Sequence, residues 1–466
     1  MNNLKNYIPF LIVVPFLLNF ILNFNSLSHI YIKTLLISLL CFLFLYVVGY
    51  EINKLFKFNS VALSIAVYLV SFFAINFLIL PIDKEYFSFK DIFIYSNTLL
   101  LVFYIYKKRN FKKPFLIIIS LLVIRLVTSN YSFFDFNYIQ YSSDVVKFWQ
   151  PMTEKIYNKD LYFAYRLNIF EGYSLMINHI FATLNLLFIG KQFFNFSLVI
   201  PNIFLFLNLL LISELKINKN IKISILLIYI SILLNSDWTS YIFFNSLMGE
   251  VIVNFLFSTF AYNVFINSDV MKKRVLLINI GFLYFLKPFA SVLFLLLAIS
   301  LYLKYKKLLY IGYPLIGFLL SNLYLNFVII NKQASNDPGI ENVYLEIFLQ
   351  NGEKFFDFNF IKVVSVFSDS LLLDRVMTLF IFIFIVIKLI NMKSKKNLNL
   401  LTLLLVINLI LVLYLYSTVW KNIEVGSAYR YVYSFVNLFF IDFAHTLDDF
   451  YKKVKNKKII SNLKAD

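Results

Sequence analysis

Long apolar runs alternate with short polar turns along most of the chain. A helix needs about 20 predominantly apolar residues to cross the hydrocarbon core of a bilayer, and we place about fourteen such spans. They cover residues 7–26, 31–50, 60–82, 92–106, 114–128, 194–213, 221–236, 241–267, 274–287, 289–304, 309–330, 371–391, 397–418 and 427–446. The pattern therefore predicts an all-α, polytopic membrane protein.

The composition strengthens this prediction. Of the 466 residues, 61% are hydrophobic and only 15% are charged, whereas soluble domains carry about 25% charged residues. A single soluble core cannot bury so much apolar surface, so we expect lipid to cover it.

Lysine and arginine gather in short clusters between the apolar runs. The formal net charge is +18, which in a soluble protein would suggest a nucleic-acid partner. Cytoplasmic loops of membrane proteins carry an excess of Lys and Arg, which explains the charge without a nucleic acid. With both termini in the cytoplasm, every cluster falls on the cytoplasmic side. The clusters lie at 54–57, 107–113, 216–222, 272–274, 304–307, 393–396 and 452–458.

One apolar run, residues 171–190, is not counted as a span. If it crossed the membrane, the basic cluster at 216–222 would lie outside. The later basic clusters would then also fall on the wrong side of the membrane. The run also contains Glu171, Asn178 and His179. We therefore predict a helix that lies in the outer interface or dips into it.

Two long segments remain on the outer side, where loops of this length usually carry function. The predicted organisation is a five-span segment (1–128), an outer loop with juxtamembrane helices (129–193), a central core (194–330), a second outer loop (331–370) and a three-span segment with a basic cytoplasmic tail (371–466). No internal repeat is evident, which disfavours transporter folds built from duplicated halves.

The single cysteine and the first apolar run place two further constraints on the kind of protein. Cys41 is the only cysteine, which excludes disulfides and thiolate metal sites within the chain. The first run lacks a small-residue cleavage site, so we interpret it as a span and not as a signal peptide.

The first outer loop contains the most informative stretch, residues 141–157. One apolar stripe at helical spacing is formed by Val145, Phe148, Trp149, Met152 and Ile156. Asp144 stands at the start of this helix, where an Asp caps free N–H groups. Pro151 should kink the helix or start a second one. The result is an amphipathic helix on the membrane surface with a carboxylate at its tip.

Asp144, Trp149, Pro151 and Lys155 follow one another in an order that resembles some bacterial members of the GT-C superfamily. These are membrane glycosyltransferases that use polyprenyl-phosphate-linked sugar donors. An acidic residue in the first large outer loop, an aromatic-rich juxtamembrane helix and a second such helix are typical of the superfamily, and the predicted helix at 171–190 matches the second helix. Simpler members have one span before this loop, whereas four precede the loop's own leading span here.

The resemblance extends downstream and covers about 129–310 and the last hairpin. Residues 281–288, ending in Lys287-Pro288, resemble a hairpin that turns on the outer side. Glu250 lies where members carry an acidic residue near the top of a span. Residues 420–431 resemble a late outer loop whose Arg-Tyr pair, here Arg430 and Tyr431, meets the donor phosphate.

The resemblance implies a role for each candidate residue. Asp144 would be the general base that takes a proton from the acceptor hydroxyl, with Asp135 as the second candidate. Cations would stabilise the departing phosphate, and these are Lys287 and Arg430. Further residues that would line the donor site are Tyr431, Glu250, Trp149, Lys155, Arg166 and Glu171.

Each candidate also has a structural interpretation. Asp144 is an N-cap in that case, Lys287 reaches the interface with its long side chain, Arg430 anchors the chain there, and Glu250 makes a polar contact between helices. His179 is interpreted as a packing residue in preference to a ligand.

No metal or nucleotide motif stands out, so no cofactor is assigned, although some GT-C relatives hold a divalent ion at such a carboxylate. The expected partners are the polyprenyl-phosphate sugar, a lipid-linked, polysaccharide or protein acceptor, and membrane lipid. The expected location is the cytoplasmic membrane with the active face outside. Two alternatives remain: a flippase or transporter of lipid-linked saccharide, and an O-antigen-type polymerase. The polymerase is disfavoured because residues 331–370 contain no arginine.

Overall fold

The protein is described from a computed structural model, which places residues 29–79, 88–109, 111–130, 150–157, 176–190, 199–235, 249–265, 274–286, 288–320, 401–407 and 436–463, together with single positions between 359 and 414. Within these residues the regular structure is helical and contains no strand. The all-α prediction is therefore confirmed.

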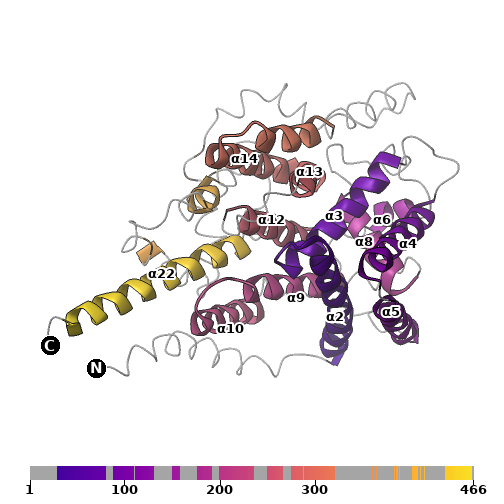
Figure 1. Ribbon diagram of the computed structural model, residues 1–466, viewed down its shortest axis with the longest axis horizontal. Helices are drawn as coiled ribbons and strands as arrows, with labels where there is room; N and C mark the ends of the chain where they lie inside the picture. Colours follow the sequence, from indigo (N-terminus) through magenta and orange to yellow (C-terminus); the bar gives the residue numbers. More distant parts are fainter. Residues whose placement is uncertain are drawn as a thin grey trace.

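The helices are labelled in Figure 1. They are α2 (His29–Phe56), α3 (Val61–Ile79), α4 (Phe89–Lys108), α5 (Lys112–Asn130), α6 (Gln150–Tyr157), α8 (Met176–Phe188), α9 (Val199–Ser213), α10 (Lys219–Asn235), α12 (Glu250–Phe265), α13 (Arg274–Phe282), the 3-10 turn η7 (Leu283–Phe285), α14 (Pro288–Tyr305) and α22 (Val436–Leu463). A further helix without a label covers Leu309–Leu320.

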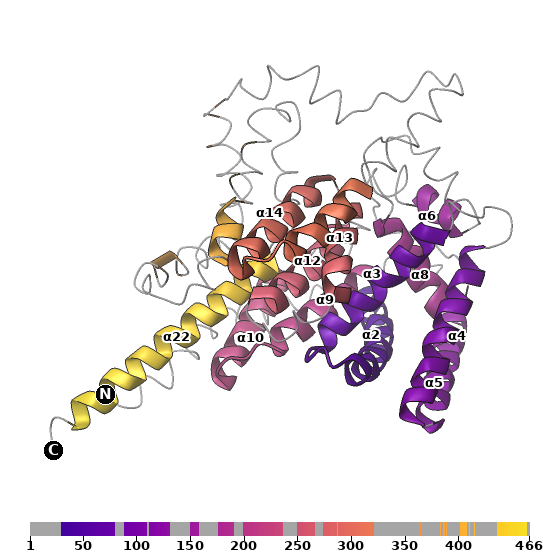
Figure 2. The ribbon, with the colours of Figure 1, turned by 45° about the horizontal axis from the view of Figure 1, so that its top comes forward.

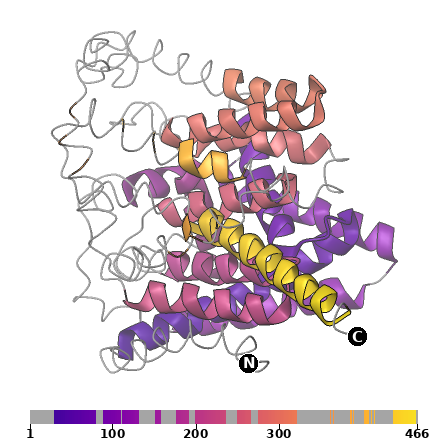
Figure 3. The ribbon, with the colours of Figure 1, turned by 90° about the vertical axis from the view of Figure 1, so that its left-hand side faces the viewer.

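The centre of the bundle is built from helices that are far apart in the sequence. α2 packs on α3 and α9, and α12 packs on α9, α3, α14 and α22. Figure 2 shows α4 and α5 as an antiparallel pair at one side, with their turn at the lower edge and α6 at the opposite edge. Figure 3 shows α22 crossing the other helices diagonally. The last predicted span ends at residue 446, but α22 continues to Leu463. The basic C-terminal segment at 452–458 is therefore part of this helix.

Two of the described helices are long and apolar enough to cross a membrane: Leu35–Phe56 and Val61–Leu78. Shorter apolar helices cover Met176–Phe188, Val199–Ser213, Glu250–Phe265 and Leu309–Leu320. The predicted count of about fourteen spans remains a prediction.

Some helices expose large apolar side chains, while others bury polar ones. Large apolar side chains are exposed along α4 and α5, including Leu99 (69%), Tyr106 (82%) and Leu126 (62%). Polar side chains such as Asn208 and Asn254 are fully buried. Soluble monomers rarely expose contiguous apolar patches beyond a few hundred Å², so these helices expose a surface suited to an apolar environment.

Two glycines allow α13 and the helix Leu309–Leu320 to touch through their backbones. A Cβ at Gly317 would lie 2.3 Å from both the carbonyl carbon and Cα of Gly281. A Cβ at Gly312, on the same helix, would meet nothing within 4 Å. Small residues at a crossing let helices approach this closely.

The first turn of α3 is capped by a side chain that lies about 150 residues later in the sequence. Glu214 follows α9, and its carboxylate accepts hydrogen bonds from the Ser60 hydroxyl (2.6 Å), the Val61 N–H (2.7 Å) and the Ala62 N–H (3.3 Å). Burial raises the pKa of the Glu214 carboxyl, and these hydrogen bonds oppose the rise. The cap fixes the start of α3 against the end of α9.

Candidate functional site

Most of the predicted site residues fall outside the described part of the chain. This applies to Asp144, Asp135, Trp149, Arg166, Glu171, Lys287, Arg430 and Tyr431. Lys155 belongs to α6, but its side chain is also outside the described part, and Lys287 stands between η7 and α14. Glu250 alone among the candidates is described with its side chain, so the site is built here from the elements that carry these residues.

The predicted juxtamembrane helix appears as α6, which begins at Gln150 and has Pro151 in its first turn. The residues just before Gln150 lie outside the described part of the chain, so both predicted effects of Pro151 remain predictions. Ile156 of the predicted apolar stripe is buried, and so are Thr153 and Tyr157.

The second predicted outer helix appears as α8, and all of its 13 residues are buried. Residues 171–175 of the predicted helix lie outside the described part of the chain. Burial of all described residues of α8 places this part of the helix among its neighbours in the bundle. Its predicted position relative to the outer interface remains a prediction.

The last turn of α8 accepts hydrogen bonds from two side chains of α5. Arg125 donates to the carbonyl oxygens of Leu187 (2.9 Å) and Leu186 (2.7 Å), and Thr128 donates to that of Phe188 (2.9 Å). The last carbonyls of a helix lack partners within it, and a cation there also complements the helix dipole. A helix that ends among other helices needs such partners, because water is excluded.

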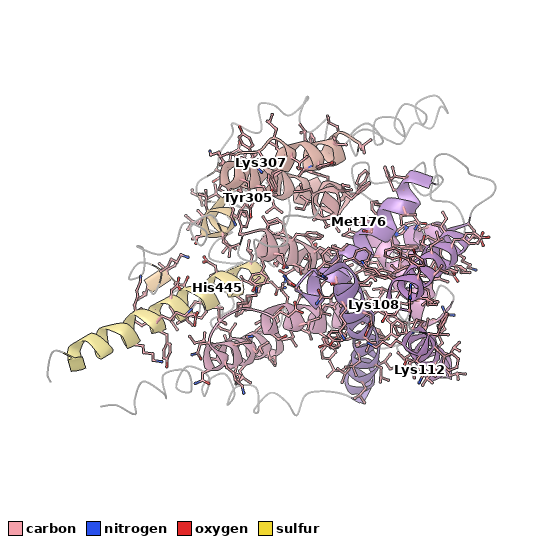
Figure 4. The ribbon with its side chains drawn as sticks, in the orientation of Figure 1. Lys108, Lys112, Met176, Tyr305, Lys307 and His445 are labelled. Carbon is pink, nitrogen blue, oxygen red and sulfur yellow. The ribbon has the colours of Figure 1, made fainter. Side chains whose placement is uncertain are left out.

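The first turn of α8 meets α6 and the start of α12. The Asn178 side chain donates to the Thr153 hydroxyl of α6 (3.2 Å). A Cβ at Gly249 would lie 2.2 Å from Cδ1 of Ile177, so the chain before α12 approaches α8 as closely as glycine allows. Figure 4 labels Met176, the first residue of α8, close to this junction.

Glu250 follows Gly249 directly and begins α12. Its side chain is fully buried, and an acidic residue at this position is favoured by the helix dipole. α8 therefore touches α6 and the residue just before Glu250, and these contacts form the Glu250 junction. The sequence places Glu250 near the end of a span but gives no sign that its side chain is fully buried.

His179 lies one turn deeper and is surrounded by aromatic rings. Its ring centroid is 5.5, 5.3 and 5.0 Å from those of Phe72, Phe73 and Phe89, and the residue is fully buried. Its Nδ1 lies 3.5 Å from the Thr183 hydroxyl. These contacts agree with the predicted packing role and tie α8 to α3 and α4.

Buried polar groups also join α22 to its neighbours. The Asn437 side chain donates to Oδ1 of Asn208 (2.6 Å), and its backbone N–H donates to Oδ1 of Asn254 (3.0 Å). Asp442 is fully buried and forms an ion pair with Lys388 (2.7 Å). Such groups link helices inside an apolar bundle, and the sequence reasoning did not identify them.

The part of the chain that the structure describes holds no group of three or more His, Cys, Asp or Glu side chains suited to a metal ion. The Glu250 junction contains one buried carboxylate among the described residues. Comparisons with protein-family models, with curated proteins and with solved structures find no match for this chain.

Proposed function

We propose that the protein is a multispanning membrane glycosyltransferase. It moves a sugar from a polyprenyl-phosphate-linked donor to an acceptor at the extracytoplasmic face, with both termini in the cytoplasm. In this proposal Asp144 is the general base, Lys287 and Arg430 contact the donor phosphate, and Tyr431 and Glu250 line the same site. The acceptor is a lipid-linked saccharide, a polysaccharide or a protein.

The membrane location is supported by the exposed apolar faces of α4 and α5 and by two helices of spanning length and composition. Exposed faces of this kind require a partner of low polarity. Lipid is the simplest such partner for helices whose remaining faces pack inside the bundle.

The proposed sidedness is supported by which helix ends touch. Ends predicted to be cytoplasmic contact one another: Lys113 pairs with Glu51 (3.0 Å), and the N–H of Asn218 donates to Asp448 (3.1 Å). Ends predicted to be outside also contact one another. Examples are Phe89 with Tyr157 (centroids 6.3 Å apart) and Phe77 with Phe285 (4.4 Å). The packing thus agrees with the predicted grouping of helix ends on two sides, and the basic clusters alone indicate which side is cytoplasmic.

The observation that carries the proposal is the set of contacts that joins α6, α8 and the chain just before Glu250. α6 adjoins the Asp144 loop, and η7 ends two residues before Lys287. Phe285 of η7 packs on Phe73 of α3, which also contacts His179 of α8. The elements next to the general base, the phosphate cation and the inner carboxylate are therefore neighbours.

The chemistry follows from these roles. Asp144 would accept the proton of the acceptor hydroxyl as that oxygen attacks the sugar. The bond between the sugar and the donor phosphate breaks, and Lys287 and Arg430 stabilise the charge that builds on the phosphate.

A transfer assay tests the proposal. The full-length protein is reconstituted into proteoliposomes with labelled polyprenyl-phosphate sugars, and transfer to lipid or added acceptor is measured. Asp144→Asn should lower the rate by about 10²–10⁴-fold, because it removes the base and keeps the size of the side chain. Asp135→Asn, in the same loop, removes the second candidate base and should retain activity if Asp144 is the base.

Glu250→Gln separates a substrate contact from a structural one. Loss of donor affinity with an unchanged unfolding midpoint supports contact with the donor, and a lower midpoint with unchanged affinity supports a contact between helices. Full transfer by Asp144→Asn would overturn the assigned base. Saccharide movement across the bilayer with no transfer from any donor would favour the flippase, and chain extension of lipid-linked repeats would favour the polymerase.

A further inference from the structure

A cavity of about 580 Å³ lies between α2, α3 and α4, away from the Glu250 junction. Its walls are apolar side chains such as Val67 and Leu100. Along one side it opens to the surface between Ile75 of α3 and Leu99 of α4, which are 39% and 69% exposed. The cavity is therefore a lateral slot in an apolar surface.

Three polar side chains in the slot have partners within the protein. The Tyr68 hydroxyl donates to Oδ1 of Asn97 (2.8 Å), and the amide of Asn97 donates to the carbonyl of Phe93 (2.8 Å). Ser71 donates to Oδ1 of Asn279 (3.2 Å). A guest gains little by offering further hydrogen bonds here, so the slot suits a hydrocarbon.

The slot has the length of one leaflet. Along α4 it runs from Ile92 to Phe103, about 16 Å at 1.5 Å per residue, which is close to half of a hydrocarbon core about 30 Å thick. Phe72 closes the outer end, where its ring packs on those of Phe89 (6.0 Å) and Phe93 (5.3 Å). The slot is therefore blind toward the predicted outer face.

The other end is rimmed by cations. Lys107 stands over the rings of Phe56 (5.9 Å) and Phe103 (5.6 Å), both of which line the slot. Lys54 and Lys108 are also exposed at this end of α2 and α4, and Figure 4 labels Lys108 here. This end faces the cytoplasm in the predicted topology, and basic pockets between helices on that side favour anionic headgroups.

We propose that the slot binds an anionic phospholipid of the cytoplasmic leaflet, with one hydrocarbon chain between α3 and α4 and the phosphate beside Lys107. The proposal rests on the membrane location and orientation proposed above, and it does not depend on sugar transfer. The bound lipid fills a gap that α3 and α4 leave between them and anchors the α4 end to the cytoplasmic surface.

Native mass spectrometry of the full-length protein in detergent tests this site. Phosphatidylglycerol and phosphatidylcholine are added in equal amounts, and the wild type should retain one phosphatidylglycerol. Leu99→Trp places an indole in the slot and should abolish this retention. Its matched control is Leu122→Trp on α5, a residue that is 53% exposed and lies outside the slot, and retention should be unchanged.

A second pair of variants tests the proposed contact between Lys107 and the lipid headgroup. Lys107→Gln should lower the preference for phosphatidylglycerol over phosphatidylcholine about fivefold, the effect of one surface cation. Lys219→Gln, an exposed lysine of α10, should leave the preference unchanged. Sugar transfer by Leu99→Trp is measured in parallel, so that loss of lipid with normal transfer is distinguished from failure of the proposed enzyme. Equal retention of both lipids by the wild type, retention by Leu99→Trp, or displacement of phosphatidylglycerol by polyprenyl phosphate would overturn the proposal.

Discussion

Gly281 and Gly317 lie in direct contact, so a methyl group added at position 317 should push two helices apart. In Gly317→Ala the new methyl group would lie 2.3 Å from the carbonyl carbon and Cα of Gly281. Carbon atoms normally approach to about 3.5–4.0 Å. The two helices would therefore have to separate by roughly 1.2–1.7 Å, because the obstructing atoms belong to the backbone and cannot rotate away.

Two opposing energies decide the result. Alanine favours a helix over glycine by about 1 kcal/mol, whereas overpacking a close contact costs about 1–3 kcal/mol or more. We expect Gly317→Ala to be destabilised by about 1–2 kcal/mol. Gly312→Ala, on the same helix with nothing within 4 Å of the new methyl, should be stabilised by up to about 1 kcal/mol.

Unfolding midpoints of both variants in the same detergent, at one heating rate, measure this difference. Gly281→Ala should fall between them, because its methyl would lie 2.9 Å from the Tyr313 carbonyl oxygen and 3.2 Å from Cα of Gly317. Midpoints for Gly317→Ala and Gly312→Ala that move in the same direction by the same amount would refute the reasoning.

Three further predictions concern buried polar groups. Lys388→Met should cost about 3–5 kcal/mol, because it leaves Asp442 charged and buried, and adding Asp442→Leu should recover most of the loss in a double-mutant cycle. Arg125→Met should destabilise the end of α8 by about 1–3 kcal/mol through two unpaired carbonyls, seen as faster amide exchange there, and unchanged exchange would contradict the cap. Glu214 has a raised pKa in the folded protein, so its contribution to stability falls as the pH rises from about 4.5 through the folded pKa. Glu214→Gln should therefore gain stability relative to the wild type over that range, and the opposite trend would mean that the three hydrogen bonds outweigh burial.

The helical elements could be predicted from sequence because each depends on a local run of residues. The hairpin of α4 and α5 is an example: the predicted spans 92–106 and 114–128 correspond to helices Phe89–Lys108 and Lys112–Asn130. The basic cluster at 107–113 marks the turn between them.

The packing could not be predicted, because it depends on partners far away in the chain. Glu214 next to a basic cluster looks like a solvated acid, yet it caps α3 through Ser60 and Val61. The burial of α8 on all sides depends on Arg125 and on the close approach of Gly249, and neither residue has a local pattern that indicates it. The candidate residue types could be predicted from sequence, whereas the contacts of α8 with α6 and with Gly249 could not.

The proposed function requires that the chain crosses the membrane and does so in the predicted direction. Labelling at the two ends of α4 tests both requirements. In a Cys41→Ala background, which leaves the chain without cysteine, Lys90→Cys and Lys108→Cys place single thiols at exposed positions on opposite ends of α4. A membrane-impermeant thiol reagent applied to intact cells should label Lys90→Cys, and it should label Lys108→Cys only after the membrane is permeabilised. Equal labelling of the two positions from outside, or labelling of Lys108→Cys alone, would contradict the topology on which the proposed site rests.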